Sequence, residues 1–225
     1  VAALLLAWRG AIPFHACAVE IDGKAILISG ATGAGKSTLT AALVAQGARF
    51  IADDLSVVDW YAAQDCFIVQ PGRPALRLYP ATAVWINPVR IEPVTDDPRG
   101  KILATPARQA SSAVPVAGLI RLGAREDPVP LAIQAAVLQA QLFRPKWLAQ
   151  LPHHTELQQK LRALAVAMRI ARMTPPIMNG TIASAAFSSR ARALIRSAIL
   201  LPHSAVQDGH AQNAQNQLAL DKKPI

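Results

Sequence analysis

The sequence predicts an α/β domain built around a glycine-rich loop, followed by a helical C-terminal portion. Three observations support this prediction. An apolar run at residues 24–29 leads directly into a glycine loop and then into a helix-forming stretch. A second short apolar run ends at two adjacent aspartates about one helix further along the chain. Beyond Leu131 the chain is rich in Ala, Leu and Gln, which favour helices.

A β-hairpin is expected before the glycine loop. Residues 14–20 form a short β-like run, and Asp22 followed by Gly23 is typical of a tight hairpin turn. Residues 24–29 then form the second strand. The opening residues 1–8 are apolar but too few for a membrane span, which needs about 20 residues. We expect them to be a buried helix end or a strand, and we expect no membrane association.

The glycine loop follows the pattern Gly-x4-Gly-Lys-Ser. Gly30 and Gly35 let the backbone curl so that several N–H groups face one anion. Lys36 is expected to reach the β- and γ-phosphates of a nucleotide, and Ser37 to bind Mg²⁺. The helix that begins near Lys36 directs its positive end at the phosphates. We therefore expect ATP and Mg²⁺ as cofactors. The expected nucleotide-binding residues are Gly30, Ala31, Thr32, Gly33, Ala34, Gly35, Lys36, Ser37 and Thr38.

Asp53 and Asp54 are expected at the same edge of the sheet as the glycine loop. A helix over residues 36–46 is about 16 Å long, and a strand over residues 48–52 returns roughly the same distance. This βαβ crossover brings both carboxylates back to the loop. One can bind the metal and the other can accept the proton of an attacking hydroxyl. Because neighbouring side chains of a strand point to opposite faces, we expect only one to enter the site fully.

Strands and loops are expected between about residues 64 and 130, where prolines separate short apolar runs. The expected strands cover residues 66–70, 75–78 and 116–122, and residues 95–112 are expected to form a polar loop.

Helices are expected over residues 131–142, 156–173 and 184–201, and residues 203–225 are polar and expected to be disordered. We therefore divide the chain into a nucleotide-binding and catalytic core (1–130), a helical portion packed on the core (131–202) and a disordered tail (203–225).

The net charge of +9 permits an anionic partner. Residues 128–207 carry nine Lys or Arg and a single acid, Glu156, so this half either binds an anion or is simply a solvated basic face. A nucleic-acid ATPase is disfavoured, because no helicase-like second motif follows and aromatic residues are only 5% of the chain. Cys17 and Cys66 are far apart and lack the Cys-x-x-Cys spacing of a metal site. We therefore expect them to be reduced thiols in a cytoplasmic protein.

The order and spacing of these motifs resemble the catalytic domain of HPr kinase/phosphorylase. His15, the Asp22-Gly23 turn, the glycine loop and the stretch Gly-Ala-Arg-Phe-Ile-Ala-Asp-Asp at residues 47–54 follow one another as they do in that family. The resemblance is close over residues 14–59 and loose over residues 70–123. It is closer still to shorter relatives without the N-terminal domain, which include kinases that phosphorylate a C-terminal serine of lasso-peptide precursors.

The resemblance implies a P-loop kinase fold of the HPr kinase type, a mixed sheet around the glycine loop. It implies that Asp53 is the general base, that Asp54 lies near the metal with Ser37, and that His15 lies beside the phosphates.

Arg77 falls at the arginine of the family's Glu-x-Arg, whereas Ala75 replaces the glutamate, which argues against reverse phosphorolysis. Lys101 lies in a loop where the shorter relatives also carry a basic residue. Taken from the residues alone, His15 is equally well explained as a polar residue at a strand edge, and Arg77 as the partner of a carboxylate that orients the sheet.

The expected function is ATP-dependent phosphorylation of a serine hydroxyl in a peptide or small protein. The basic C-terminal half would hold an acidic segment of that acceptor or its C-terminal segment through the terminal carboxylate. Nucleic acid is not expected as a partner, and the hexamers of the parent family make a homo-oligomer an open alternative. Two other functions stay open: a small-molecule kinase, which needs a closed acceptor pocket, and a nucleotide-binding regulator without turnover. The loss of the glutamate at Ala75 favours the regulator, and the retention of both aspartates counts against it.

Overall fold

The computed structural model describes residues 2–95, 97–125, 127–174 and 184–200. Eight strands form the main sheet. They are β1 (Ile12–Phe14), β2 (Ala16–Ile21), β3 (Lys24–Gly30), β4 (Arg49–Ala52), β5 (Ser56–Tyr61), β6 (Cys66–Gln70), β10 (Val114–Leu122) and β11 (Arg169–Met173). Their order is β1-β5-β6-β10-β3-β2-β4, with β11 paired to β10. The long strand β10 pairs with β6 near its start and with β3 and β11 further on, so it joins both halves of the sheet.

The predicted hairpin and βαβ crossover are both present. Strands β2 and β3 are antiparallel, with Ala18 opposite Leu27. Helix α2 (Lys36–Ala45) follows β3 and leads to β4. Because β4 is antiparallel to β2, it runs parallel to β3, with β2 inserted between them. The crossover therefore skips one strand and still returns the end of β4 to the edge of the sheet that holds the glycine loop.

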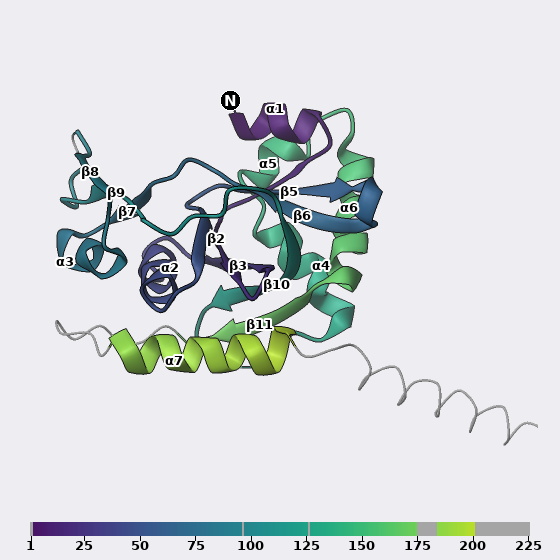
Figure 1. Cartoon of the computed structure of the whole chain (residues 1–225). Helices are drawn as coiled ribbons and strands as arrows, with labels where there is room; N and C mark the ends of the chain where they lie inside the picture. Colours follow the sequence, from purple (N-terminus) through teal and green to yellow (C-terminus); the bar gives the residue numbers. More distant parts are fainter. Residues whose placement is uncertain (1, 96, 126, 175–183, 201–225) are drawn as a thin grey trace, which may run out of the picture.

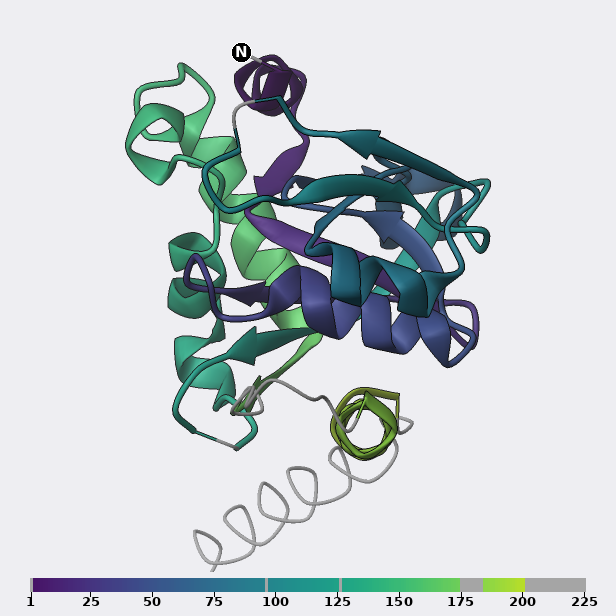
Figure 2. The same cartoon turned by 90° about the vertical axis from the view of Figure 1, so that its left-hand side faces the viewer.

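Helices cover both faces of the main sheet (Figure 1). On one face lie α4 (Leu131–Ala140), α5 (Pro145–Leu148) and α6 (His154–Ala167). On the other lie α2 and α7 (Ser184–Leu194), which continues as a π-helix over Ile195–Leu200. Figure 2 shows α7 end-on beneath α2. Strand β3 divides its side chains between these layers: Leu27 packs with the α4–α6 layer, and Ile26 and Ile28 pack with the α2 layer.

A second, three-stranded sheet lies beside α2. It has the antiparallel order β7-β9-β8 and is joined by short helices. Its elements are β7 (Leu76–Leu78), α3 (Pro80–Ala83), a 3₁₀ turn at Val84–Ile86, β8 (Arg90–Pro93) and β9 (Ile102–Thr105); a further 3₁₀ turn, Ala62–Gln64, lies between β5 and β6. We expected a polar loop over residues 95–112, and β9 corrects this. Its residues form a strand because the backbone pairs with both β7 and β8, which local composition does not reveal.

The expected helix over residues 156–173 is also corrected. Helix α6 ends at Ala167, and Arg169–Met173 instead forms β11, which pairs in parallel with β10 over five residues. Burial of Ile170, Ala171 and Met173 in the sheet outweighs the helix-forming composition of this stretch. The C-terminal portion therefore contributes a strand to the main sheet as well as helices. The predicted tail, residues 203–225, lies outside the described residues.

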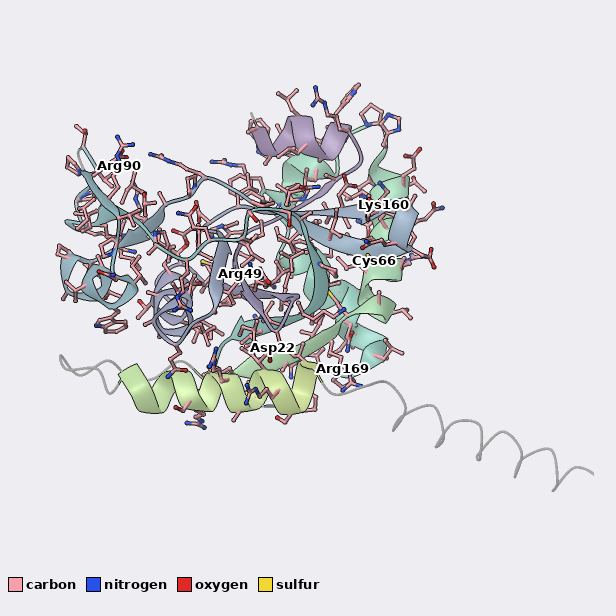
Figure 3. All side chains as sticks on the ribbon, in the orientation of Figure 1. Asp22, Arg49, Cys66, Arg90, Lys160 and Arg169 are labelled. Atoms are coloured by element: carbon pink, nitrogen blue, oxygen red, sulfur yellow. The ribbon has the colours of Figure 1, made fainter. Side chains whose placement is uncertain are left out.

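The apolar N-terminal segment forms helix α1 (Ala2–Trp8). It buries Ala3 and Ala7, whereas Leu5 and Trp8 are exposed, so it covers the domain with one face only. Lys160 of α6 donates a hydrogen bond to the Gly10 carbonyl, which ties this segment to the helical layer (Figure 3). None of the helices in the described ranges combines the length and apolar character needed to cross a membrane.

Gly118 is a point of close approach between β10 and the C-terminal layer. A Cβ there would lie 2.6 Å from the Arg169 carbonyl oxygen and 2.5 Å from Ile199 Cγ2. We expect Gly118→Ala to lower the free energy of unfolding by about 1–3 kcal/mol, because the overpacked β10 must move away from β11. Chemical denaturation measures this. Gly123→Ala is the matched control, since its Cβ would meet nothing closer than 3.8 Å. Equal stability of the two variants would contradict the packing described here.

Candidate functional site

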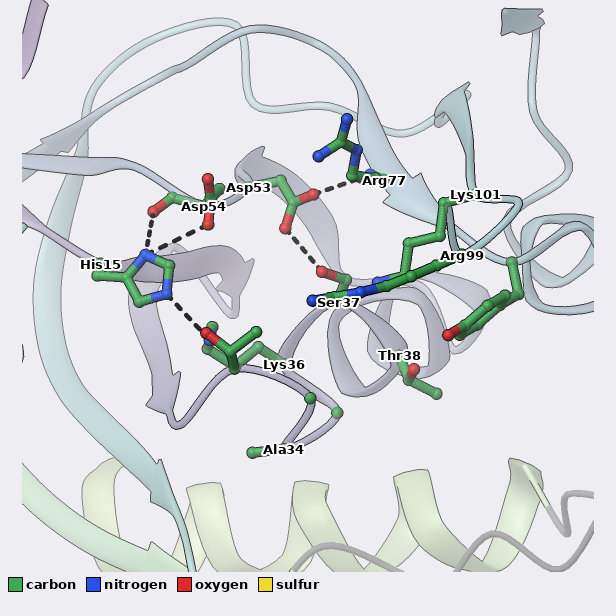
Figure 4. A pocket seen from close by; sticks show the side chains of 14 residues that line it. His15, Ala34, Lys36, Ser37, Thr38, Asp53, Asp54, Arg77, Arg99 and Lys101 are labelled. Carbon is green, nitrogen blue, oxygen red and sulfur yellow. Dashed lines mark hydrogen bonds and ion pairs between the residues drawn. The ribbon is translucent and has the colours of Figure 1, made fainter. Parts of the chain in front are cut away.

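A cavity of about 630 Å³ opens where β3 ends (Figure 4). Residues 32–38 of the glycine loop and α2 form one wall. Arg77, Tyr79, Arg99 and Lys101 line it from the small sheet and the segment before β9. His15 and the two aspartates complete the lining. The fold therefore gathers in one cavity the residues that the sequence singled out at separate positions, apart from Gly30 and Ala31.

The glycine loop presents an open concave backbone to this cavity. Gly33 and Gly35 have φ values of 85° and 92°, which strain residues with a side chain. A Cβ at either position would meet no atom within 4 Å, so the space over the loop is open. Helix α2 begins at Lys36, and no side chain caps its N-terminal N–H groups. The backbone donors that a phosphate group needs are thus available to a ligand.

Lys36 lies beneath the loop with its side chain directed along it. The residue is only 8% exposed, and its Nζ donates to the carbonyls of Gly30 at 3.0 Å and Ala31 at 3.3 Å. Gly30 and Ala31 do not line the cavity and instead hold Lys36 in place. The lysine is therefore fixed at the base of the phosphate-binding wall.

Asp53 lies at the centre of the site and accepts three hydrogen bonds. Its Oδ1 accepts from Ser37 Oγ at 3.0 Å and from Cys17 Sγ at 2.9 Å. Its Oδ2 accepts from the Arg77 backbone N–H at 2.8 Å. The carboxylate thus connects the glycine loop, the main sheet and the small sheet.

Asp54 enters the same cavity, which differs from the expectation that only one aspartate would do so. Strand β4 ends at Ala52, and Asp54 has a left-handed φ of 65°. The two aspartates are therefore not strand residues, and their side chains need not point to opposite faces. The Asp54 side chain is 72% exposed, and its Oδ1 lies 3.2 Å from His15 Nδ1. Asp54 is therefore the more accessible of the two carboxylates.

His15 connects Asp54 to the lysine of the loop. Its Nε2 lies 3.3 Å from Lys36 Nζ, while Nδ1 lies 3.2 Å from both the Asp54 carbonyl and its carboxylate. A neutral imidazole that carries its proton on Nδ1 satisfies all these contacts, donating to Asp54 and accepting from Lys36. His15 is thus part of the cavity and not only a polar residue at a strand edge.

The oxygen atoms of this site fit Mg²⁺ that arrives with a nucleotide. Magnesium takes oxygen ligands and keeps several waters, so it needs only one or two protein ligands beside phosphates. The Ser37 hydroxyl and the Asp53 carboxylate, 3.0 Å apart, provide such a pair. Within the described ranges, no group of three or more His, Cys, Asp or Glu is arranged as a complete metal site.

Four residues of the site were not anticipated: Cys17, Tyr79, Asp97 and Arg99. Cys17 lies two positions after His15. Because alternate residues of a strand lie on the same face, this spacing could have predicted Cys17 at the site. Asp97 and Arg99 lie in the stretch expected to be a loop, and only Lys101 had been singled out there. Arg77 does pair with a carboxylate, since its Nε lies 3.3 Å from Asp97 Oδ2.

The two thiols are expected to differ sharply in reactivity. Cys17 is fully buried, and burial together with the Asp53 carboxylate raises the pKa of its thiol well above the ordinary range. Cys66 is partly exposed at the start of β6 (Figure 3). Intact-mass measurement after treatment of the native protein with a thiol reagent at pH 8 should show one modification, on Cys66. Rapid modification of Cys17 would contradict the closed packing beneath Asp53.

Comparison with known proteins gives one family match and similar solved structures. Residues 9–71 match the family model described as HPr Serine kinase C-terminal domain. Among solved structures, one similar chain is described as "Structure of the Hpr(Ser) kinase/phosphatase from Coxiella burnetii". It is 14% identical, with 90% of this chain and 96% of that chain covered and a TM-score of 0.41. No curated protein matches the chain. The matched residues include His15, the glycine loop and both aspartates, so the similarity to this family model covers the part of the cavity lining that precedes the small sheet.

Proposed function

We propose that this chain is an ATP-dependent kinase that transfers a phosphoryl group to a serine hydroxyl of a peptide or small protein. One observation carries the proposal. The open glycine loop, the Ser37–Asp53 pair and a second, accessible carboxylate on Asp54 all face a single cavity. A phosphate cradle, a metal-binding pair and a proton acceptor are the parts that phosphoryl transfer needs.

The glycine-loop wall would hold the nucleotide. Backbone N–H groups of residues 32–38 and the Lys36 ammonium would bind the phosphates, while Ser37 and Asp53 would hold the metal. Bound Mg²⁺·ATP supplies the transferable γ-phosphoryl group, with the metal neutralising phosphate charge. Lys36 Nζ contacts the Gly30 and Ala31 carbonyls and His15 Nε2, which occupy its three N–H donors, so at least one of these contacts would be exchanged for a phosphate oxygen when the nucleotide binds.

The contacts of the aspartates support a division of roles opposite to the one implied by the family resemblance. Three donors already occupy the Asp53 carboxylate, and one of them is the expected metal ligand Ser37. Asp54 is more exposed, and of its carboxylate oxygens Oδ1 lies 3.2 Å from His15 Nδ1. We therefore assign Asp53 to the metal and Asp54 to the acceptor proton, with His15 orienting Asp54.

In this scheme the acceptor hydroxyl is oriented by the cavity and loses its proton to Asp54. The serine oxygen forms a bond to the γ-phosphorus as the bond from that phosphorus to the β–γ bridging oxygen breaks. The products are a phosphoserine and ADP. Among the described residues, none beyond Lys101 lines the cavity, so we assign the reaction to the core, residues 1–130, and a supporting role to the helical portion, residues 131–202.

The acceptor is tested by phosphotransfer with ATP and Mg²⁺, read by intact mass. The acceptor panel contains HPr protein and serine-ending peptides encoded beside the gene, because the family match names HPr and the shorter relatives act on peptide precursors. We expect one acceptor to gain a phosphate, and we expect Lys36→Ala to abolish the gain. A nucleotide-bound protein that phosphorylates no member of the panel would instead favour a small-molecule kinase or a nucleotide-binding regulator.

A further inference from the structure

The small sheet directs three cations into the cavity. Arg77 comes from β7, and Arg99 and Lys101 come from the segment between β8 and β9 (Figure 4). We propose that these side chains form an anion-binding subsite for a carboxylate of the acceptor, which is therefore a peptide that is acidic close to its phosphorylated hydroxyl. The inference rests on the proposed function in assigning this subsite to the acceptor.

A single carboxylate, Asp97, contacts the side chain of Arg77 and the backbone of Arg99. Asp97, whose side chain is only 6% exposed, forms an ion pair with Arg77, with 3.3 Å between Oδ2 and Arg77 Nε. Its Oδ1 accepts from the Arg99 backbone N–H at 2.8 Å, and its carbonyl accepts from the Gly100 N–H at 3.0 Å. The turn at residues 97–100 is thereby tied to β7, so Arg99 and Arg77 are held on the same wall before any ligand binds. Such prior ordering lowers the cost of binding.

Lys101 is positioned separately, on an aromatic ring. Its Nζ lies 5.1 Å from the centroid of Tyr79, which is itself half exposed on the cavity wall. A cation over an aromatic face is held in place without losing its charge to a carboxylate. Lys101 therefore remains able to pair with an incoming anion.

The cations outnumber the carboxylate that pairs with them. Arg77, Arg99, Lys101 and Asp97 sum to a charge of 3 − 1 = +2 on this wall. Within the ranges that the structure describes, no carboxylate pairs with the Arg99 guanidinium or the Lys101 ammonium. Clustered positive charge with open coordination attracts an anionic ligand and suits carboxylate recognition.

The position of Asp53 places this subsite on the acceptor side. Asp53 accepts from Ser37 of the glycine-loop wall and from the Arg77 backbone of the small sheet, so it lies between the two walls. The glycine-loop wall has its own cation, Lys36, for the nucleotide phosphates. A hydroxyl that reaches Asp54 from the other side of Asp53 would bring its neighbouring groups against Arg77, Arg99 and Lys101.

This placement differs from one expectation drawn from charge. The basic half of the chain, residues 128–207, was expected either to hold an acidic or C-terminal segment of the acceptor or to be a solvated basic face. In the described part of the chain, no residue beyond Lys101 lines the cavity. Apart from Lys36, the cations that line the cavity therefore come from the small sheet and the segment before β9.

The test measures binding of a defined peptide probe. The full chain, saturated with Mg²⁺ and a non-hydrolysable ATP analogue, is titrated against a fluorescein-labelled serine peptide with acidic side chains and a free C-terminal carboxylate. A matched probe has every carboxylate replaced by an amide. We expect the acidic probe to bind at least about tenfold more tightly, since one or two charge-assisted hydrogen bonds are worth that much. Arg99→Ala and Lys101→Ala should remove most of the difference.

The matched control is Arg90→Ala. Arg90 lies on β8 of the same small sheet, is exposed, pairs with Glu92 and does not line the cavity (Figure 3). Arg90→Ala removes one positive charge, as Arg99→Ala and Lys101→Ala do, and should leave the binding of both probes unchanged. An equal loss in Arg90→Ala and Lys101→Ala would show that the attraction is only a long-range effect of net charge, and this would overturn the subsite.

Two further results would overturn the inference. One is equal binding, or no binding, of the acidic and amide probes by the unaltered chain. The other is a loss of affinity for the ATP analogue in Arg99→Ala or Lys101→Ala that matches the loss for the peptide, because the cations would then belong to the nucleotide. The proposed function fails separately: a chain that prefers the acidic probe but phosphorylates no acceptor with ATP keeps the subsite and loses the kinase activity.

Discussion

Replacing Lys36 by alanine should lower the affinity for Mg²⁺·ATP by at least about 100-fold, because a fixed, largely desolvated cation at the phosphates is lost. Lys36 is 8% exposed, and its ammonium is held by the Gly30 and Ala31 carbonyls at the base of the glycine loop. Titration with a fluorescent ATP analogue in the presence of Mg²⁺ measures the effect.

Two additional variants separate the loss of charge from a loss of fold. Lys36→Met retains most of the side-chain volume and should lose nucleotide affinity as Lys36→Ala does. Lys24→Ala removes an exposed lysine from the start of β3, at the end of that strand away from the glycine loop, and should bind the nucleotide normally. Nucleotide affinity that survives in Lys36→Met would contradict the phosphate-binding role of the loop.

The second large effect concerns the replacement of each aspartate by asparagine. We expect the two variants to lose different steps of the reaction. Asparagine keeps the size and one acceptor oxygen of each side chain but cannot take up a proton as a carboxylate does. Asp54→Asn should reduce phosphoryl transfer by about 100-fold or more, the usual contribution of a general base, while nucleotide binding persists. Asp53→Asn should instead weaken the nucleotide binding that depends on Mg²⁺, since Asp53 lies 3.0 Å from Ser37 Oγ.

Nucleotide titrations with and without Mg²⁺, together with single-turnover transfer rates, distinguish the two variants. His15→Asn provides a third variant for the same measurements. Loss of its contact to Asp54 should slow phosphoryl transfer without changing the Mg²⁺ dependence of nucleotide binding. If Asp53→Asn binds Mg²⁺·ATP normally and loses transfer, the roles are those implied by the family resemblance, with Asp53 as the base.

The part of the site that could be predicted from the sequence is the part set by short-range spacing. The loop from Gly30 to Ser37 has a fixed pattern, and one helix plus one strand separate it from Asp53. Those lengths determine where the chain returns, so the cavity contains both features as expected. The insertion of β2 between β3 and β4 did not change the result, because the direction of β4 was preserved.

The remaining parts depend on long-range pairing that the local sequence does not show. Cys17 meets Asp53 only because β2 pairs with β4, with Ala18 opposite Ala52. The stretch that contains β9 is polar and rich in turns, and it becomes ordered through the small sheet and through Asp97. Strand β11 forms because β10 offers it an open edge, which outweighs the helical composition of Arg169–Met173.

The central claim is that this cavity transfers the γ-phosphoryl group of ATP to a serine of a protein or peptide. The most direct measurement incubates the chain with γ-labelled ATP, Mg²⁺ and the acceptor panel, and then locates any phosphate by mass spectrometry of the acceptor. We predict phosphoserine on one acceptor with the unaltered chain, none with Lys36→Ala, and formation about 100-fold slower or more with Asp54→Asn. Nucleotide binding without phosphoserine on any acceptor, or phosphoserine formed equally well by Lys36→Ala, would contradict the account.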